Sequence, residues 1–296
     1  SASSAVRQGA RPVFAEIDER TFNLDPADIE ARITSRTRAI MPVHYAGQGC
    51  AMPEIMAIAR RHGLMVIEDA AQALGASFAG QPLGTFGLAN AFSLHVTKNV
   101  IAGEGGFLVT DDDALAERAE IIREKGTNRS RFLRGQVDKY TWVDLGSSYV
   151  LSDLLAALAL AQFDRMEAMQ RRRQVLWNRY QQALQPLEQR GDVWRPHIDP
   201  RAALNGHLYA FCVRDQARRD GVIDRLRRRG IGATFHYIPL HSAPYAQAQW
   251  GYRPADLPIT ERVAASLIRL PLYPDLSPAE QDEVIEALFE ALDDPA

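Results

Sequence analysis

The chain has 296 residues, of which 46% are hydrophobic, so it can bury a large core and fold as one large domain with a smaller appendage. Its 34 basic and 37 acidic side chains nearly cancel, which gives no electrostatic argument for binding nucleic acid or a membrane surface. No apolar run reaches the length of a membrane-spanning helix, and the two distant cysteines, Cys50 and Cys212, suit a reducing cytoplasm rather than a disulfide framework.

The first half of the chain alternates predicted strands with predicted helices. Asp25 opens one helical pattern as an N-cap, and Gly63 ends another. The alternation predicts an α/β fold with a mostly parallel sheet. The predicted strands cover 12–18, 38–45, 64–69, 89–95 and 105–110, and the predicted helices cover 25–33, 52–63 and 114–126.

The second half reads as a connecting helix followed by a small α+β domain. From about 151 to 190 an apolar stripe predicts long helical structure. Beyond it lie apolar runs at 207–213 and 233–239 and helical patterns at 220–231 and 278–292. The basic triplets at 171–173 and 227–229 are expected on solvated helix faces. We therefore expect a large domain at 1–165, a connecting helix at 166–190 and a small C-terminal domain at 191–296.

Lys98 lies in the stretch AFSLHVTKNVIAGEGG, after an apolar run and before a loop with three glycines. This pattern predicts an amine at the end of a strand, beside backbone that a ligand can approach closely. Asp69 ends a second apolar run, where a helix would begin. Carboxyl ends of parallel strands share one ligand-binding edge, so we expect the two residues to meet there. An amine that can form a Schiff base and a carboxylate that keeps a pyridine nitrogen protonated are the groups that pyridoxal phosphate needs.

Each of these two residues also has a simpler explanation. Most lysines are solvated surface groups, and an Asp after a strand more often caps a helix than binds a cofactor. A generic α/β domain in which Lys98 and Asp69 are incidental is therefore one alternative. The presence of both residues after buried, strand-like runs favours the cofactor site.

Taken together, the ordered motifs resemble the DegT/StrS-type sugar aminotransferases. The resemblance covers essentially the whole chain through the blocks PVHYAGQGC, EDAAQ, FSLHVTKN, GEGG and FHYIPLH, and it is densest in REKGTNRSRFLRGQVDKYTWVDLGSSYVLSD. It implies the pyridoxal-phosphate-dependent transferase fold of type I, with a mostly parallel large domain and a small α+β C-terminal domain.

The resemblance also implies roles for the residues around the lysine. Lys98 would hold pyridoxal 5′-phosphate covalently and move a proton between the substrate and the cofactor. Asp69 would pair with the pyridinium nitrogen, an opposite charge at close range that favours the charged ring. Gln72 would lie by the ring face or its 3′ oxygen, and Ser93 would donate to the phosphate. His95 belongs to the same motif, but it alternates with Ser93 on one strand face, so packing explains it equally well.

Residues farther along the chain are implied near the sugar nucleotide or the domain junction. These are His44, Tyr45 and the segment from His236 to His241, although a histidine at a strand end is more often structural. No metal site is expected.

The segment 127–149 would form a loop that reaches the partner subunit's site, which implies a homodimer with shared active sites. The family usually shows a Gly-aromatic-Asn-aromatic-Arg pattern there, whereas this chain reads GSSYV from Gly146 to Val150. Ser148 can still donate to a phosphate, but Val150 cannot replace the charge of the arginine.

The start of the chain departs from the family more seriously. The resemblance implies that several tens of residues precede this point, supplying a phosphate-binding loop and one interior strand. Helix-terminus amides and hydroxyls aimed at a phosphate are worth roughly 1.5–3 kcal/mol each. We therefore expect a fragment, or a truncated product, of a longer enzyme with weakened cofactor retention.

The implied reaction moves an amino group from glutamate to a nucleotide-linked keto sugar, with Lys98 protonating the sugar carbon. The implied acceptor is dTDP-4-dehydro-6-deoxyglucose, aminated at carbon 4 for cell-surface polysaccharide synthesis. Two alternatives remain besides the generic domain. One is a dehydratase with the same cofactor, a branch that carries His where this chain has Lys98. The other is a non-catalytic chain that pairs with a full-length subunit.

Overall fold

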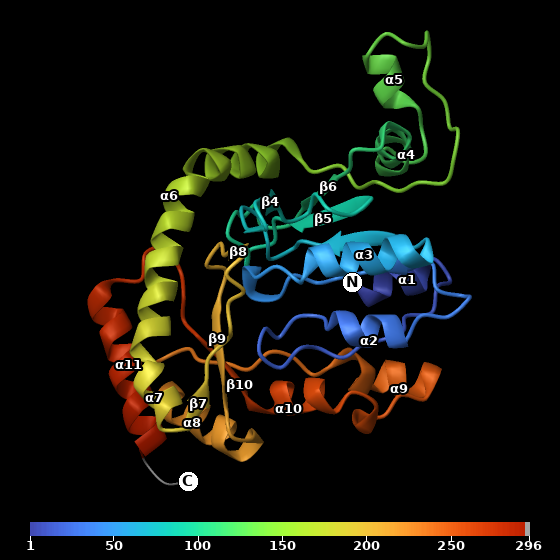
Figure 1. Cartoon of the computed structure of the whole chain (residues 1–296). Coiled ribbons are helices and arrows are strands. Elements are labelled where there is room, and N and C mark those ends of the chain that lie inside the picture. The colour runs from blue at the N-terminus through green and yellow to red at the C-terminus, as the bar shows by residue number, and fades with distance from the viewer. Residues whose placement is uncertain (294–296) are drawn as a thin grey trace.

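The computed structural model describes residues 1–293, and its central feature is a four-stranded sheet in the order β1-β2-β5-β6 (Figure 1). The first three strands run parallel, and β6 runs antiparallel to β5, so the predicted mostly parallel sheet is confirmed. Asp69 pairs with Ala91, so β2 and β5 end at the same edge. The strands are β1 (Ala39–Ile40), β2 (Met65–Asp69), β5 (Ala89–Ser93) and β6 (Gly106–Val109).

Helix α3 (Met52–His62) shows how the sequence builds the layer beside this sheet. Met52, Ile55 and Ile58 repeat at helical spacing and are buried, each contributing roughly 1.5–3 kcal/mol through burial. Pro53 lies in the first turn, where its missing N–H costs nothing. Gly63 ends the helix in the left-handed region, with φ +62°.

A second sheet, in the order β10-β9-β7, is antiparallel and forms the centre of the C-terminal part. Every residue of β9 is buried, and α8 (Gln216–Arg228) and α10 (Pro258–Ser266) contact this strand. A third, smaller sheet in the order β4-β3-β8 joins residues before 83 to residues after 201. The strands are β3 (Ser77–Phe78), β4 (Gln81–Pro82), β7 (Val193–Trp194), β8 (Ala202–Ala203), β9 (Tyr209–Val213) and β10 (Leu267–Leu270).

The long helix α6 (Asp153–Ala183) confirms the predicted helical segment and runs down one side of the molecule (Figure 1). The side chain of Ser152 caps it by accepting the amide of Leu155. Its last turns bury Leu176, Trp177 and Tyr180 in the C-terminal core, whereas its first turns expose leucines. The proposed domain limits at 165 and 190 both fall in or near this helical region and stay a prediction.

Two helices, α4 (Asp113–Arg123) and α5 (Arg129–Leu133), project from the sheet with the loop that leads to α6 (Figure 1). Neither helix buries a side chain. We call residues 113–152 the arm. The other helices are α1 (Ala2–Arg7), α2 (Pro26–Ala31), η1 (Tyr45–Gly47), α7 (Gln185–Gln189), α8 (Gln216–Arg228), η2 (Leu240–Ser242), α9 (Pro244–Trp250), η3 (Pro254–Asp256), α10 (Pro258–Ser266) and α11 (Pro278–Asp293).

Several predicted elements are wrong or shorter than expected. The strand expected at 12–18 is reduced to a single bridge between Ile17 and Leu24. The strand expected at 38–45 is interrupted after Ile40, because Pro42 has no N–H to give the ladder, and pairing with β2 resumes only as a bridge between Val43 and Asp69. Residues 233–239 form only one bridge, between Thr234 and Arg269.

No helix begins at Asp69, where the sequence predicted one. The chain turns sharply through 71–75 instead, with Gly75 at φ +78°. Within the described residues, no helix combines the length and the hydropathy that crossing a membrane would require.

Candidate functional site

Lys98 lies in a tight loop that follows β5. The amide of Leu94 donates to the carbonyl of Gly105 at 2.9 Å, and the amide of Lys98 donates to the carbonyl of His95 at 2.9 Å. Gly105 has φ +137°, and a Cβ on Gly106 would lie 2.4 Å from the carbonyl oxygen of Phe92. The glycines that the sequence places after the lysine are therefore needed to close this loop.

The amine of Lys98 is half-buried and lies close enough to Asp69 for their charges to interact. Burial lowers the pKa of Lys98, Asp69 opposes this effect, and the charge of Arg269 adds to it, so that the pKa falls below its ordinary value. The structure thus brings the predicted lysine and aspartate together. A lowered pKa favours the neutral, nucleophilic amine.

The carboxylate of Asp69 stands at the end of β2. Its Oδ1 accepts the amide of Ala71 at 3.1 Å, and its Oδ2 accepts the hydroxyl of Ser1. Gln72 lies in the turn that follows, where its Oε1 accepts the amide of Ala46 at 2.7 Å. Ser93, at the end of β5, is half-buried, and its hydroxyl accepts the amide of His95 at 3.2 Å.

His44 and Glu68 form a fully buried pair on the other face of β2. His44 Nε2 lies 2.9 Å from Glu68 Oε2, and Nδ1 accepts the amide of Cys50 at 3.2 Å. Glu68 also accepts the amides of Gly84, Phe86 and Gly87 at 2.6–2.8 Å. Both ring nitrogens of His44 are therefore used inside the protein, which leaves none for the substrate contact that the sequence suggested.

Tyr45 and His236 meet where the C-terminal part faces the sheet edge. The hydroxyl of Tyr45 lies 3.3 Å from His236 Nδ1, and Arg269 Nη1 donates to His236 Nε2 at 3.1 Å. Burial lowers the pKa of His236 to about 4, and the charges of Arg269 and Lys98 act in the same direction. His236 is therefore neutral near pH 7, and its ring stacks on Tyr237 with centroids 4.3 Å apart.

Other predicted residues lie apart from this cluster. His241 is buried, and its Nε2 lies 3.0 Å from Glu261 Oε1. His95 makes its contacts within its own loop, with its Nδ1 2.9 Å from Thr97 Oγ1. Ser148 is exposed on the arm, where it bridges Glu124, and within the described chain it has no contact with Lys98 or Asp69.

The sequence reasoning missed a buried network beside the lysine. His207 Nδ1 donates to Asn99 Oδ1 at 2.9 Å, and Asn99 Nδ2 donates to the carbonyl of Asn205 at 3.0 Å. Burial lowers the pKa of His207 to about 3, and the charge of Lys98 adds to this effect. The only signal in the sequence was that Asn99 directly follows Lys98.

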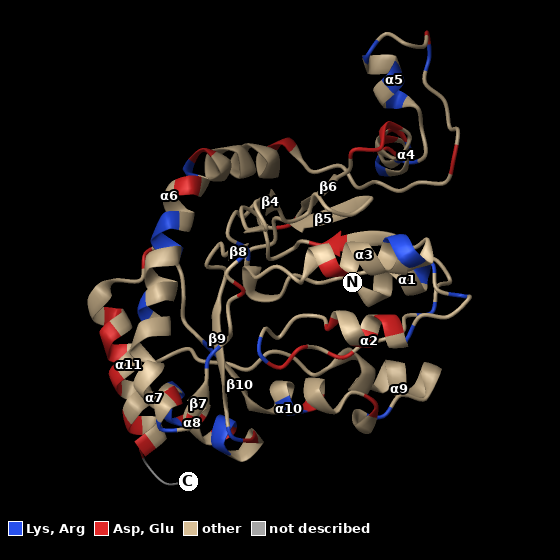
Figure 2. Cartoon of the chain, in the orientation of Figure 1, with Lys and Arg blue, Asp and Glu red and all other residues tan. Residues whose placement is uncertain are grey.

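Arg173 corrects the expectation of a solvated face at 171–173. It is only 8% exposed, and its Nη1 donates to the carbonyls of His207 and Leu272, each at 3.2 Å. Arg171 is exposed and pairs with Glu167, and residues 227–229 are also exposed, so the expectation of a solvated face is confirmed there. Farther along α6, Arg179 pairs with Asp282 of α11 (Figure 2).

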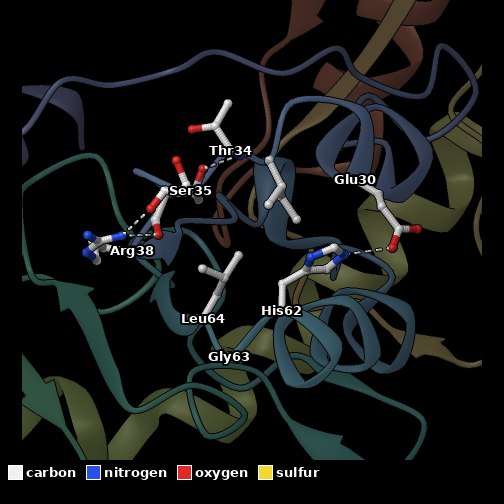
Figure 3. A pocket seen from close by; sticks show the side chains of 9 residues that line it. Glu30, Thr34, Ser35, Arg38, His62, Gly63 and Leu64 are labelled. Atoms are coloured by element: carbon white, nitrogen blue, oxygen red, sulfur yellow. Dashed lines mark hydrogen bonds and ion pairs between the residues drawn. The ribbon is translucent and has the colours of Figure 1, made fainter.

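A separate hollow of about 490 Å³ lies at the opposite edge of the sheet (Figure 3). Arg38 and Leu64, which line it, directly precede β1 and β2, so the hollow is at the amino ends of these strands. His62 points toward Glu30, with 3.0 Å between Nε2 and Oε1. The hollow contains none of the residues around Lys98.

The residues at the carboxyl edge fit the donor set that pyridoxal phosphate requires. An amine, a carboxylate and a hydroxyl come from Lys98, Asp69 and Ser93, and all three are half-buried. Asp69 and Ser93 end the neighbouring strands β2 and β5, and Lys98 lies in the loop that follows β5. The charge of Asp69 raises the pKa of Lys98, so the two groups lie within electrostatic range of each other.

The model of the DegT/DnrJ/EryC1/StrS aminotransferase family matches residues 1–289. The chain belongs to this family. It is 38% identical over 295 residues to the spore coat polysaccharide biosynthesis protein SpsC of Bacillus subtilis, covering 97% of this chain and 75% of SpsC. The family is pyridoxal-phosphate-dependent, so this is the cofactor of the chain.

Solved structures agree with this assignment and confirm the type I fold of these aminotransferases. DesV of S. venezuelae, solved in complex with a ketimine intermediate, superposes with a TM-score of 0.89 at 32% identity, covering 100% of this chain and 76% of DesV. A putative sugar aminotransferase of Streptococcus pneumoniae, Spr1654, superposes with a TM-score of 0.89 at 26% identity, covering 98% of this chain and 76% of Spr1654. The latter was solved in forms that carry PLP and PMP.

Proposed function

We propose that this chain transfers an amino group from glutamate to the keto carbon of a nucleotide-linked sugar. The observation that carries the proposal is the half-buried amine of Lys98, whose pKa burial lowers, within charge range of Asp69 at one sheet edge. The family supports it, since SpsC is named for polysaccharide biosynthesis and Spr1654 for a putative sugar aminotransferase.

Each residue around Lys98 would have a distinct role in this reaction. Pyridoxal phosphate, when bound, supplies a carbonyl that takes up the amine and a ring that accepts electrons. Lys98 would hold the cofactor and then carry a proton to and from the reacting carbon. Asp69 would keep a proton on the ring nitrogen, and Ser93 would donate its hydroxyl to the phosphate. Gln72, fixed by the amide of Ala46, would limit the position of the ring.

The proposed acceptor is dTDP-4-dehydro-6-deoxyglucose, aminated at carbon 4. To test this, the chain is incubated with the cofactor, glutamate and the dTDP sugar, and the product is examined by mass spectrometry. Gain of an amino group with release of 2-oxoglutarate supports transamination. Loss of water without amine transfer would indicate the dehydratase, and absence of both would favour a non-catalytic chain.

We also propose a homodimer, which would act in the cytoplasm. Large apolar side chains of the arm and of the start of α6 are exposed, which is costly for a surface in water. Sedimentation equilibrium tests this proposal, and a monomer at micromolar concentration would contradict it. The exposed side chains are Phe132, Leu133, Tyr140, Trp142, Val143, Leu145, Tyr149, Val150, Leu154, Leu158, Leu160 and Phe163.

A further inference from the structure

Asn99, the residue after Lys98, anchors the lysine loop to the C-terminal part of the chain. The two residues before the lysine are exposed, whereas Asn99 is only 7% exposed. Its Nδ2 donates to the carbonyl of Asn205 at 3.0 Å, and its Oδ1 lies 2.9 Å from Nδ1 of His207. The loop is therefore held from the inside by a buried side chain, one residue away from the amine that would carry the cofactor.

The hydrogen bonds of Asn99 fix the position of the proton on His207. Because Nδ2 of Asn99 donates to Asn205, the atom that faces the ring is the acceptor Oδ1, so Nδ1 of His207 carries a proton. Burial lowers the pKa of His207 to about 3, and the charge of Lys98 acts in the same direction. The ring is therefore neutral near pH 7, and it supports Asn99 without adding a charge beside the lysine.

The two partners of Asn99 are themselves held in place. The amide of His207 donates to Oδ1 of Asn205 at 3.0 Å, and both residues are buried. Nδ2 of Asn205 donates to the carbonyls of Gln72 and Leu74 at 2.8 and 3.0 Å. These carbonyls belong to the turn after β2, so the lysine loop is fixed relative to the strand whose terminal carboxylate acts on the lysine.

We propose that Asn99 and His207 position Lys98, holding its loop so that the amine stays half-buried within charge range of Asp69. The inference rests on the role proposed for Lys98. An amine on a flexible four-carbon stem can occupy many places, and a fixed loop limits them to those near the cofactor site. A neutral amide and a neutral imidazole provide this support without altering the charge at the amine, which an acidic or basic side chain would change.

Chemical labelling of the amine tests the proposal without any reaction of the cofactor. The full chain, free of cofactor, is treated with trace acetic anhydride over a range of pH, and acetylation of Lys98 is followed by peptide mass spectrometry. In Asn99→Ala we expect the pKa of Lys98 to rise toward its ordinary value, because a loosened loop releases the amine from the burial that lowers it. Pyridoxal phosphate, titrated by its absorbance, should bind about tenfold or more weakly.

The matched control is Asn90→Ala, at the start of β5. Asn90 is also buried, and its Nδ2 donates to the carbonyls of Gly87 and Val109 at 3.1 and 3.2 Å. Both variants should lower the midpoint of urea unfolding, because each loses a buried amide with two hydrogen bonds. Only Asn99→Ala should move the pKa of Lys98. An unchanged pKa in Asn99→Ala, or an equal shift in Asn90→Ala, overturns the proposal.

Two variants of His207 decide the question if Asn99→Ala does not fold. His207→Asn keeps an N–H at the same number of bonds from Cα as Nδ1, whereas His207→Leu leaves Oδ1 of Asn99 without its donor. We expect cofactor affinity within about twofold of native in His207→Asn, with the pKa of Lys98 unchanged, and both altered in His207→Leu. Equal behaviour of the two variants overturns the proposal.

Failure of the proposed function is read separately. If glutamate does not change the absorbance of the cofactor bound to native protein, transamination fails. The labelling uses no substrate, so it still reports whether Asn99 and His207 place the amine of Lys98.

Discussion

The two edges of the central sheet both carry charged side chains, but these are paired with opposite charges at the amino edge and not at the carboxyl edge. At the amino edge, Glu30 accepts hydrogen bonds from Arg61 and His62, and all three side chains are at least about one-third exposed. At the carboxyl edge, Lys98 and Arg269 lie together in part-buried positions without such a matched set of partners. Opposite charges that pair with each other at an exposed surface have little remaining attraction for a charged ligand, whereas part-buried charges without partners can bind one. The hollow of Figure 3 therefore offers a ligand fewer charges without partners than the carboxyl edge does, although it is an open cavity.

The largest effect is expected from Lys98→Ala. This change removes the amine that would attach the cofactor and move the proton, so borohydride should trap no cofactor and amine transfer should fall about 10³-fold or more. Circular dichroism should show an intact fold, because the side chain is only half-buried. Trapped cofactor in the variant would exclude Lys98 and, with it, the contrast between the two edges.

The next largest effect is a loss of stability, and it separates the two neighbouring carboxylates of β2, Glu68 and Asp69. Glu68→Gln places an amide group where one buried carboxylate accepts three backbone amides and faces His44, so urea unfolding should show a loss of about 3–5 kcal/mol. The control Asp69→Asn, one residue along on the other face, should lose about 1 kcal/mol or less. Equal losses would mean that Asp69 is also structural.

A smaller effect concerns the pH dependence of cofactor attachment, which needs the neutral amine of Lys98. Asp69 raises the pKa of Lys98 and Arg269 lowers it. The pH midpoint of attachment, followed by absorbance, should therefore move to lower pH in Asp69→Asn and to higher pH in Arg269→Gln. Shifts in the same direction in both variants would contradict the charge arrangement described for this edge.

The smallest effect is expected at the amino edge. His62→Gln alters an exposed pair with Glu30, and it should leave cofactor binding, amine transfer and the midpoint of urea unfolding within error of the native protein. Weaker cofactor binding in this variant would mean that the hollow communicates with the lysine edge.

Local sequence signals predicted the elements that carry strong periodicity and clear ends. The helix that stops at Gly63 and the strand that ends at Asp69 follow from residues that are neighbours in the chain. The strand expected at 89–95 is also present, but it ends two residues earlier, at Ser93. The sequence also predicted that Lys98 and Asp69 share one edge of the sheet, because strand ends of a parallel sheet lie there, and the charge of Asp69 does act on Lys98. Their roles toward the cofactor stay predictions.

The rest of the site could not be predicted because it depends on tertiary contacts. Arg173 lies in a basic triplet that resembles a solvated helix face, and only the carbonyls of His207 and Leu272 explain its burial. The sequence around His44 indicates a polar residue at the end of a strand. Its partner Glu68 lies on the neighbouring strand of the sheet, so the buried pair cannot be seen in the local sequence. Long-range partners of this kind leave no pattern in a single sequence.

The side chains around Asn205 have a mechanical consequence. Asn205 donates to the carbonyls of Gln72 and Leu74, and its own carbonyl receives Asn99, so the turn after β2, the lysine loop and the approach to β9 are tied together. A rotation of the C-terminal sheet would therefore also displace the loop that carries Lys98. The arm lacks such ties within the chain, since its two helices bury no side chain, so its position depends on what packs against it.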